Sequence, residues 1–448
     1  MRRIVRPLLV VAFIVGGVGA AWSQGGPDTI LFNGVLVTMD DARPTGTAIA
    51  ISGDRVVAIG SDEEILATQG SATRLIDLEG RTVIPGFVDA HTHLFNDAWA
   101  WDATILEMQQ LALENGITTF ANMYAPPDFL MEMEVLDAIG ALRLRLSLYL
   151  SGTSNCGDDL EDWYLAHPVN RDPESHLRIL GVKLFADGGS CGRPAIGIPY
   201  ADTGEHGDLF QTQDWLNAAV MRAHHFGYQV AIHAQGDLAI DQALNAIEFA
   251  LRGQPNNSRH RIEHNAIVRD DQLHRYGEIG VVPTLFGTYF TCFGVTDGGY
   301  EPIFGAENIA ITENWRRLLD ANPGLIAAWH GDDPGVLPVS PILELYGFVT
   351  RSQIREETGE VCEAPDWLRE FGVTAEEALR MMTINAAYAL FMDDAVGSLT
   401  PGKFADLVVL SDNPLAVVPA DIKDITIEAT FLGGDAVFCA VGRERFCD

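Results

Sequence analysis

His91 and His93, separated by one residue, follow an apolar segment at residues 83–88. Such a segment predicts a buried strand, and residues two apart on a strand point to the same side. The two imidazoles would therefore leave the end of one strand together, at a spacing that suits a single metal ion. Two exposed loop histidines are the alternative, and the ligands found later in the chain argue against it.

Four later segments also have the sequence pattern of strands, and the ligands that would complete such a site are found there. The segments are residues 179–186, 228–233, 260–264 and 325–329. Polar side chains stand within or just after the ends of these segments: Lys183, His233, His264 and Asp332. Active sites of parallel barrels are built at the carboxyl ends of the strands. We therefore expect six side chains to converge at a barrel mouth: His91, His93, Lys183, His233, His264 and Asp332.

Strand and helix patterns alternate through the middle of the chain, and the third strand is predicted at residues 145–150. The helical segments between the predicted strands, such as residues 213–226 and 240–251, carry apolar residues at a 3.6-residue spacing. This alternation predicts the α/β class and a (β/α)8 TIM barrel over residues 85–392. Two insertions, at residues 151–176 and 287–311, follow the third and seventh strands and are candidate lids or substrate walls.

Both ends of the chain are rich in short extended segments, such as residues 30–37, and in turn signals, such as Asn33-Gly34. Residues 27–84 and 393–448 are predicted to be the two parts of one small β-sandwich domain beside the barrel. Residues 1–23 read as a signal peptide, because a basic start precedes an apolar stretch and a small-x-small cleavage site. The stretch is short for a membrane span, although an uncleaved anchor is the alternative.

A cleaved signal places the protein in an exported compartment, periplasmic or extracellular, with no stable membrane association after signal removal. The six cysteines show no C-x-x-C spacing, so we expect disulfides between some of them rather than a cysteine zinc site. The net charge of -33 over 448 residues disfavours nucleic acid or an anionic membrane surface as a partner, but it does not identify a substrate. The partner expected from the candidate site is a small-molecule substrate. A homo-oligomer is left open.

The chain resembles the amidohydrolase superfamily of metal-dependent hydrolases, and within it amidohydrolase family 3. The resemblance covers nearly everything after the signal segment. Its ordered markers begin with Pro85-Gly86-Phe87-Val88-Asp89-Ala90-His91-Thr92-His93, Gly181-Val182-Lys183-Leu184-Phe185-Ala186-Asp187-Gly188 and His233-Ala234-Gln235-Gly236-Asp237. They continue with His260-Arg261-Ile262-Glu263-His264, Thr383-Ile384-Asn385-Ala386-Ala387 and the segment at residues 397–407. The family's fold is a (β/α)8 barrel beside a β-sandwich built from both termini.

The resemblance implies a centre with two divalent metal ions. Lys183 would be N6-carboxylated, and this carbamate would bridge the ions. His91, His93 and Asp332 would hold one ion, and His233 and His264 the other. Zinc is the first expectation from the imidazole-rich ligands, and Mn²⁺, Fe²⁺ or Co²⁺ would also fit.

The implied reaction is hydrolysis of a C–N bond in an amide, N-acyl compound or dipeptide. The metals would activate water, and the catalytic Asp332 would act as general base and then general acid. One alternative is a mononuclear deaminase or cyclic-amidase-type hydrolase. An alternative of another class is a non-catalytic binding protein, which the complete ligand set disfavours.

Candidate substrate-binding residues follow the predicted strands. They are Trp99, Tyr124, Arg193, Phe286 and His330. The aromatic rings would favour an apolar or aromatic group, with loop packing as the alternative. Arg193 would bind a carboxylate through two parallel hydrogen bonds. His330 stands where relatives commonly place a glycine, so it would either contact substrate or fill the barrel mouth.

Overall fold

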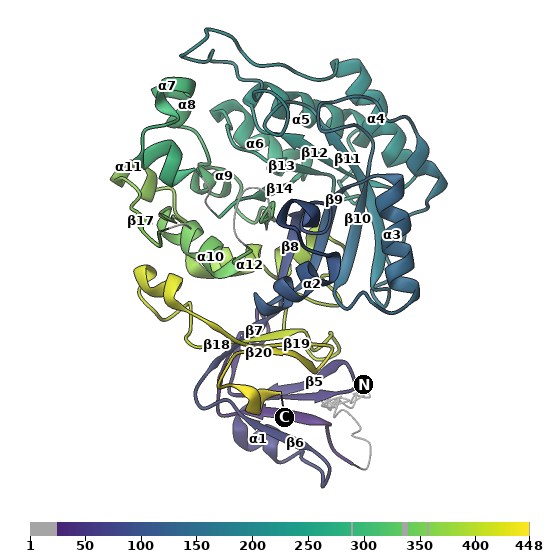
Figure 1. Cartoon of the computed structure of the whole chain (residues 1–448), viewed down its shortest axis with the longest axis vertical. Coiled ribbons are helices and arrows are strands. Elements are labelled where there is room, and N and C mark those ends of the chain that lie inside the picture. Colours follow the sequence, from purple (N-terminus) through teal and green to yellow (C-terminus); the bar gives the residue numbers. More distant parts are fainter. Residues whose placement is uncertain (1–24, 288–289, 334–338, 356–357, 448) are drawn as a thin grey trace, which may run out of the picture.

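The protein consists of a barrel and a smaller β-domain that contains both ends of the described chain (Figure 1). The computed structural model describes residues 25–287, 290–333, 339–355 and 358–447. The predicted signal peptide, residues 1–23, lies outside the described residues. Among the described residues, the helices are all too short or too polar to cross a membrane.

Eight parallel strands form the barrel, and each lies beside the one before it in sequence. They are β8 (Phe87–Thr92), β9 (Ile117–Ala125), β10 (Arg145–Ser151), β11 (Leu177–Phe185), β12 (Gln229–Ala234), β13 (Arg261–His264), β14 (Val282–Leu285) and β15 (Ala328–Trp329). Two backbone bonds close the ring just beyond β15. Asp332 N donates to His91 O at 3.1 Å, and His93 N donates to Asp333 O at 2.8 Å. The predicted (β/α)8 barrel is confirmed.

Helices surround the barrel strands. The principal ones are α2 (Ile105–Glu114), α3 (Pro127–Ala138), α4 (Gln213–His225), α5 (Asp237–Leu251), α6 (Asp270–Ile279), α9 (Trp315–Ala321), α10 (Pro341–Thr350), α12 (Ala375–Met381) and α13 (Ile384–Ala389). In α4, Thr212 caps the first turn by accepting from Trp215 N. Leu216, Val220 and Ala223 form the buried stripe that the 3.6-residue pattern predicts.

Two sheets make up the β-domain. One has the order β5-β4-β1-β6, and the other has the order β20-β19-β18-β7-β2-β3. Their strands are β1 (Thr29–Phe32), β2 (Val35–Val37), β3 (Thr45–Gly46), β4 (Ala48–Ser52), β5 (Arg55–Gly60), β6 (Arg74–Asp77), β7 (Thr82–Pro85), β18 (Leu407–Leu410), β19 (Ile427–Leu432) and β20 (Asp435–Cys439). Because β7 pairs with β18, the second sheet joins the two ends of the chain, as the sequence predicts.

Gly86 links the β-domain to the barrel by separating β7 from β8. A Cβ atom there would lie 2.2 Å from Thr118 Oγ1, so only glycine allows this close approach. On the other side of the joint, Arg145 of β10 binds Asp406 through Nε at 2.7 Å. Both side chains are buried, which fixes the barrel against the segment that leads into β18.

Short elements occupy the connections. They are the helices α1 (Asp62–Leu66), α7 (Glu301–Phe304), α8 (Ala306–Ile309) and α11 (Asp366–Arg369), the hairpin β16 (Gln353–Ile354) and β17 (Val361–Cys362), the 3-10 turns η1 (Ala98–Trp101), η2 (Trp163–Ala166), η4 (Pro419–Asp424) and η5 (Glu444–Phe446), and the π-helical turn η3 (Thr291–Thr296).

Three disulfides pair all six cysteines: Cys156–Cys191, Cys292–Cys362 and Cys439–Cys447. The Cys156–Cys191 disulfide joins the predicted insertion after β10 to residues 186–212. This second long connection was not predicted from the sequence. The Cys292–Cys362 disulfide joins the insertion after β14 to the β16–β17 hairpin.

Candidate metal centre

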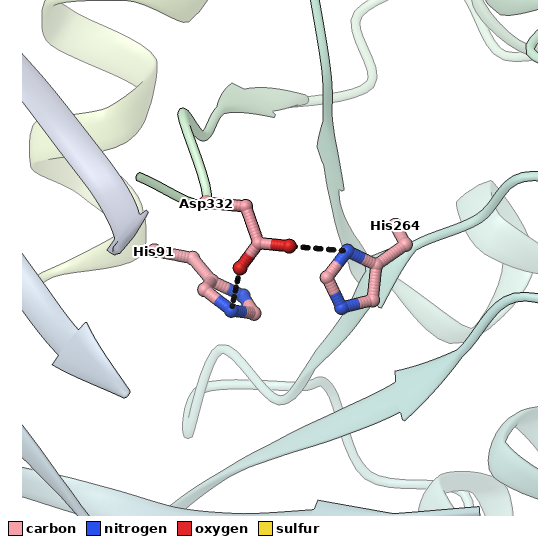
Figure 2. Close-up of side chains that lie close together, drawn as sticks. All are labelled: His91, His264 and Asp332. Carbon is pink, nitrogen blue, oxygen red and sulfur yellow. Dashed lines mark ion pairs between the residues drawn. The ribbon is translucent and has the colours of Figure 1, made fainter. Parts of the chain in front are cut away.

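Three predicted ligands meet where β8 and β15 end. Asp332 Oδ1 lies 3.1 Å from His91 Nε2 and 3.3 Å from His93 Nε2. The two imidazole nitrogens are 3.4 Å apart. Figure 2 shows Asp332 between His91 and His264, with its second oxygen 4.0 Å from His264 Nδ1. The predicted convergence of these side chains is thus present in the structure.

Two of these residues have left-handed backbone conformations. The φ angle is 73° at His264 and 56° at Asp332. Non-glycine residues rarely adopt such angles, and the cost is tolerated where the surrounding structure fixes the backbone. At Asp332 the fixing bond is the one from its amide to His91 O. The strained turn directs the carboxylate toward the histidines rather than along the strand.

A buried ion pair orients His91. Its Nδ1 lies 2.7 Å from Glu263 Oε2, and Arg261 holds the same carboxylate through Nε at 2.6 Å and Nη2 at 2.8 Å. Although burial opposes ionisation, the Arg261 guanidinium and then His91 hold the pKa of Glu263 well below its usual value. Burial lowers the pKa of His91, so its imidazole is neutral. The neutral ring donates its Nδ1 hydrogen to Glu263 and presents the lone pair of Nε2 to the site.

Glu263 and Arg261 were not predicted from the sequence to have a functional role. The available signal was two charged residues, two apart, within a buried four-residue strand. Such residues share one face of the strand and need partners, because an unpaired buried charge is costly.

Lys183 lies at the floor of the same site. Its side chain is fully buried on β11, and Nζ has no hydrogen-bond partner among the described residues. Burial lowers the pKa of Lys183 to about 8, although Glu263 and Asp332 oppose this shift. Lys183 therefore neither points outward to solvent nor pairs with Asp187 in the described contacts.

His233 and His264 stand side by side across the site from His91. Their ring centroids are 4.5 Å apart. His233 Nε2 donates to Gly188 O at 3.0 Å, which leaves Nδ1 as its lone-pair nitrogen. His264 Nδ1 is buried without a hydrogen-bond partner among the described residues.

These residues fit a bound divalent cation. Ligand atoms held at zinc distances in a tetrahedral arrangement are about 3.3 Å apart, close to the separations among His91, His93 and Asp332. Buried polar atoms without partners, such as Lys183 Nζ and His264 Nδ1, need a further group to satisfy them. Although burial opposes it, His91 and His93 hold the pKa of Asp332 well below its usual value, so the site contains a carboxylate.

A cavity of about 520 Å³ opens over this centre. His93, Lys183, His233, His264 and Asp332 form its floor, and Tyr124 and Phe286 are among its walls. Two of the predicted substrate-binding residues therefore line the cavity.

The other three predicted contacts lie elsewhere. Trp99 is 75% exposed and is absent from the described cavity wall. Arg193 is held by Asp202 through two bonds of 2.7 Å and is not among the described lining residues. His330 is fully buried beneath the wall, with its ring 4.0 Å from Phe286, so it fills the barrel mouth. Tyr289, which like Phe286 follows the seventh predicted strand and is a candidate contact for the same reason, lies outside the described residues.

Two nearby acids have structural roles. Asp187 accepts backbone N–H groups from Ala195 at 2.9 Å and Gly236 at 2.8 Å. Asp237 is the first residue of α5 and binds Arg269 at 2.6 Å, while Gly236 takes the cap position. The side chain of Asp237 is thus held by Arg269.

A barrel with this centre defines a metal-dependent hydrolase, and sequence comparison names the family. The model described as "Amidohydrolase family" matches residues 74–122 and 102–438, so the chain belongs to the amidohydrolases, which hydrolyse C–N bonds. YtcJ of Bacillus subtilis is 28% identical over 57% of this chain and 46% of its own length. The N-substituted formamide deformylase of Arthrobacter pascens is 23% identical over 91% of this chain and 97% of its own.

Solved structures support the same fold. An uncharacterized metal-dependent hydrolase from Pyrococcus horikoshii matches with a TM-score of 0.72 at 20% identity, over 88% of this chain and 99% of the other. A Xaa-Pro dipeptidase matches with a TM-score of 0.61 at 18% identity, over 92% of this chain and 100% of the other. At these identities the likeness concerns the fold.

Proposed function

We propose that this amidohydrolase holds two divalent metal ions, with Zn²⁺ as the first choice, and hydrolyses an amide or N-acyl bond. The observation that carries the proposal is the fully buried, unpartnered Lys183 amine among four histidines and a carboxylate. His91, His93 and Asp332 would hold one ion, His233 and His264 the other, and N6-carboxylated Lys183 both. Bound ions would polarise the substrate carbonyl and lower the pKa of the attacking water.

Carboxylation of Lys183 is favoured by its surroundings. The reaction joins a neutral amine nitrogen to the carbon of CO₂ and releases one proton. A pKa of about 8, caused by burial, leaves far more neutral amine at pH 7 to 8 than an exposed lysine has. The carbamate would also give the buried Nζ the polar neighbours that it lacks among the described residues.

Asp332 is the proposed general base and acid. Its Oδ1 faces His91 and His93, while Oδ2 is directed toward His264 across the cavity floor. Oδ2 would take the proton from the attacking water and return it to the leaving nitrogen.

We also propose that the protein acts after export, in the periplasm or outside the cell. Three disulfides, which pair every cysteine, support an oxidising compartment. Cell fractionation and N-terminal sequencing would test this. A mature chain that begins near Gln24 is expected, whereas an intact Met1 on a cytosolic protein would contradict export.

Metal counting tests the proposed centre. The chain from Gln24, produced with bicarbonate and zinc or manganese, should contain about two metal ions by elemental analysis. Lys183→Ala should lose at least one of them. Lys403→Ala is the matched control, because Lys403 is a half-buried lysine that donates to Val396 O in the β-domain joint.

The outcomes separate the competing functions. Two ions that depend on Lys183 justify a screen of amides, N-acyl amines and dipeptides. One ion that is insensitive to Lys183 would favour a mononuclear deaminase or cyclic-amidase-type hydrolase. A folded chain that binds no metal would favour a non-catalytic binding protein.

A further inference from the structure

The cavity above the metal centre has mostly aromatic walls. Outside the floor, its described lining includes five rings and three neutral polar side chains. The rings belong to Tyr124, Phe185, Phe286, Tyr300 and Phe304, and the polar groups belong to Asn155, Ser190 and Gln235. Such walls suit a flat apolar group, with hydrogen bonds at a few points only.

The described lining carries no arginine, and its one lysine is Lys183 at the floor. The internal segments outside the described residues, 288–289, 334–338 and 356–357, contain neither Lys nor Arg in the sequence. A substrate carboxylate placed among the walls would therefore meet no cationic partner from this lining. Burying such a charge without a partner is costly.

The nearest arginine in sequence to the wall is already committed. Arg193 stands between the lining residues Gly192 and Pro194, but its guanidinium binds both oxygens of Asp202 at 2.7 Å. The guanidinium also lies 4.8 Å from the centroid of the Tyr200 ring. The two bonds to Asp202 thus occupy the guanidinium hydrogens that a substrate carboxylate would otherwise bind.

The wall carries one acid outside the proposed metal ligands. Asp97, four residues after His93, lines the cavity. It is half-buried, so its charge is less screened than that of a surface acid. The net charge of -33 adds a long-range field that opposes anionic substrates.

We propose that this cavity selects amides whose side group is aromatic and uncharged or cationic, and that it discriminates against substrates bearing a carboxylate. Free dipeptides and N-acyl amino acids would then be poor substrates, whereas N-acyl derivatives of aromatic amines would be good ones. Asp97 is the specificity-determining residue that favours an ammonium group over a carboxylate. This inference rests on the proposed metal centre.

Hydroxamates that share one metal-binding group test the selectivity directly. Isothermal titration of the zinc-loaded protein would compare benzohydroxamic acid with its 4-aminomethyl and 4-carboxy derivatives. Because the anchor is common to all three, differences in Kd report on the walls. The carboxy compound should bind at least about tenfold more weakly than the other two.

Matched variants assign the effect to Asp97. Asp97→Asn should reduce the advantage of the aminomethyl compound several-fold, whereas Asp102→Asn, an exposed acid five residues later, should leave it unchanged. Equal or tighter binding of the carboxy compound would overturn the proposal. If Arg193→Ala abolished that binding, Arg193 would be the carboxylate site. Binding of none of the three would overturn the metal centre and the selectivity together.

Discussion

Glu263 Oε2 accepts a hydrogen bond from His91 Nδ1 at 2.7 Å, with both side chains fully buried. The bond turns the opposite ring nitrogen of His91 toward Asp332. Arg261, two residues earlier on β13, fixes the carboxylate with two bonds of its own. His91, the first proposed metal ligand of the chain, is thus oriented by β13, which is not a neighbour of β8 in the barrel.

Glu263→Gln should weaken metal binding about 10- to 100-fold, since outer partners of ligand histidines set their orientation and basicity. Competition with a chelator of known affinity would measure this. The variant should also lose thermal stability, because Arg261 keeps its charge without a partner. Glu313→Gln is the control, because Glu313 pairs with Arg351 at 3.1 Å in an equally buried pair. The Glu313→Gln variant should lose thermal stability but keep its metal affinity.

Asp332→Asn should lower kcat by about 10²- to 10⁴-fold on any amide that the screen yields, because the amide cannot accept the proton from water. Metal content, measured beside the rate, shows how far lost ligation contributes. Asp202→Asn removes an acid that pairs with Arg193 outside the described cavity lining, and it should keep kcat within about twofold. A fully active Asp332→Asn enzyme would rule out the proton-transfer role.

Breaking the Cys156–Cys191 disulfide should raise KM and the hydroxamate Kd, while kcat changes less. The bond joins two loops whose neighbouring residues, Asn155 and Ser190, line the cavity. Without it, binding must order both loops, so we expect an increase of about tenfold. Paired serine substitutions at Cys156 and Cys191 would be compared with the same change at Cys439 and Cys447. Equal KM values in the two variants would contradict this role of the bond.

His260 should make the fold sensitive to acid. Burial lowers its pKa to about 3, and the neutral ring accepts from Val230 N through Nδ1. Because the unfolded chain binds this proton near pH 6.5, stability from this group is complete above that pH and falls as the pH decreases toward 3. From pH 6.5 to 5 the loss would be up to about 2 kcal/mol.

Urea unfolding of wild-type and His260→Gln proteins across this pH range would measure that loss. The variant should show a shallower decline, since glutamine can accept from Val230 N without titrating. His225→Gln, a change at an exposed helix position, is the control and should follow the wild type. Parallel curves for wild type and His260→Gln would show that His260 does not contribute.

Most of the barrel was predictable because its strands and helices have distinct periods. The third strand, predicted at residues 145–150, is β10 at Arg145–Ser151. The eighth, predicted at residues 325–329, pairs with β14 only at Ala328 and Trp329, so β15 is shorter. Residues 30–37, expected as extended, divide at Asn33, whose φ of 58° sends β1 and β2 into different sheets. The Asn33-Gly34 turn signal marks that division.

The convergence of the proposed metal ligands was predictable because strand ends meet at one end of a barrel, whereas the substrate contacts were not. Arg193 has the right chemistry for a carboxylate, but its partner Asp202 lies nine residues away in an irregular loop that no periodicity describes. Trp99 follows the first strand yet faces solvent in η1. Asp97 carries no local motif, and only the folded cavity shows that it lines a wall.

The pairing of β7 with β18 has a consequence for the order in which the protein can be made. β7 leads through Gly86 into the strand of His91, yet its partner is synthesised more than three hundred residues later. During translation, β7 can pair with β2, but its other edge, which pairs with β18, stays unpaired until nearly the whole chain has emerged. The nascent protein therefore depends on protection of that edge, and a ribosome that stops before Leu407 releases a chain that cannot complete its second sheet.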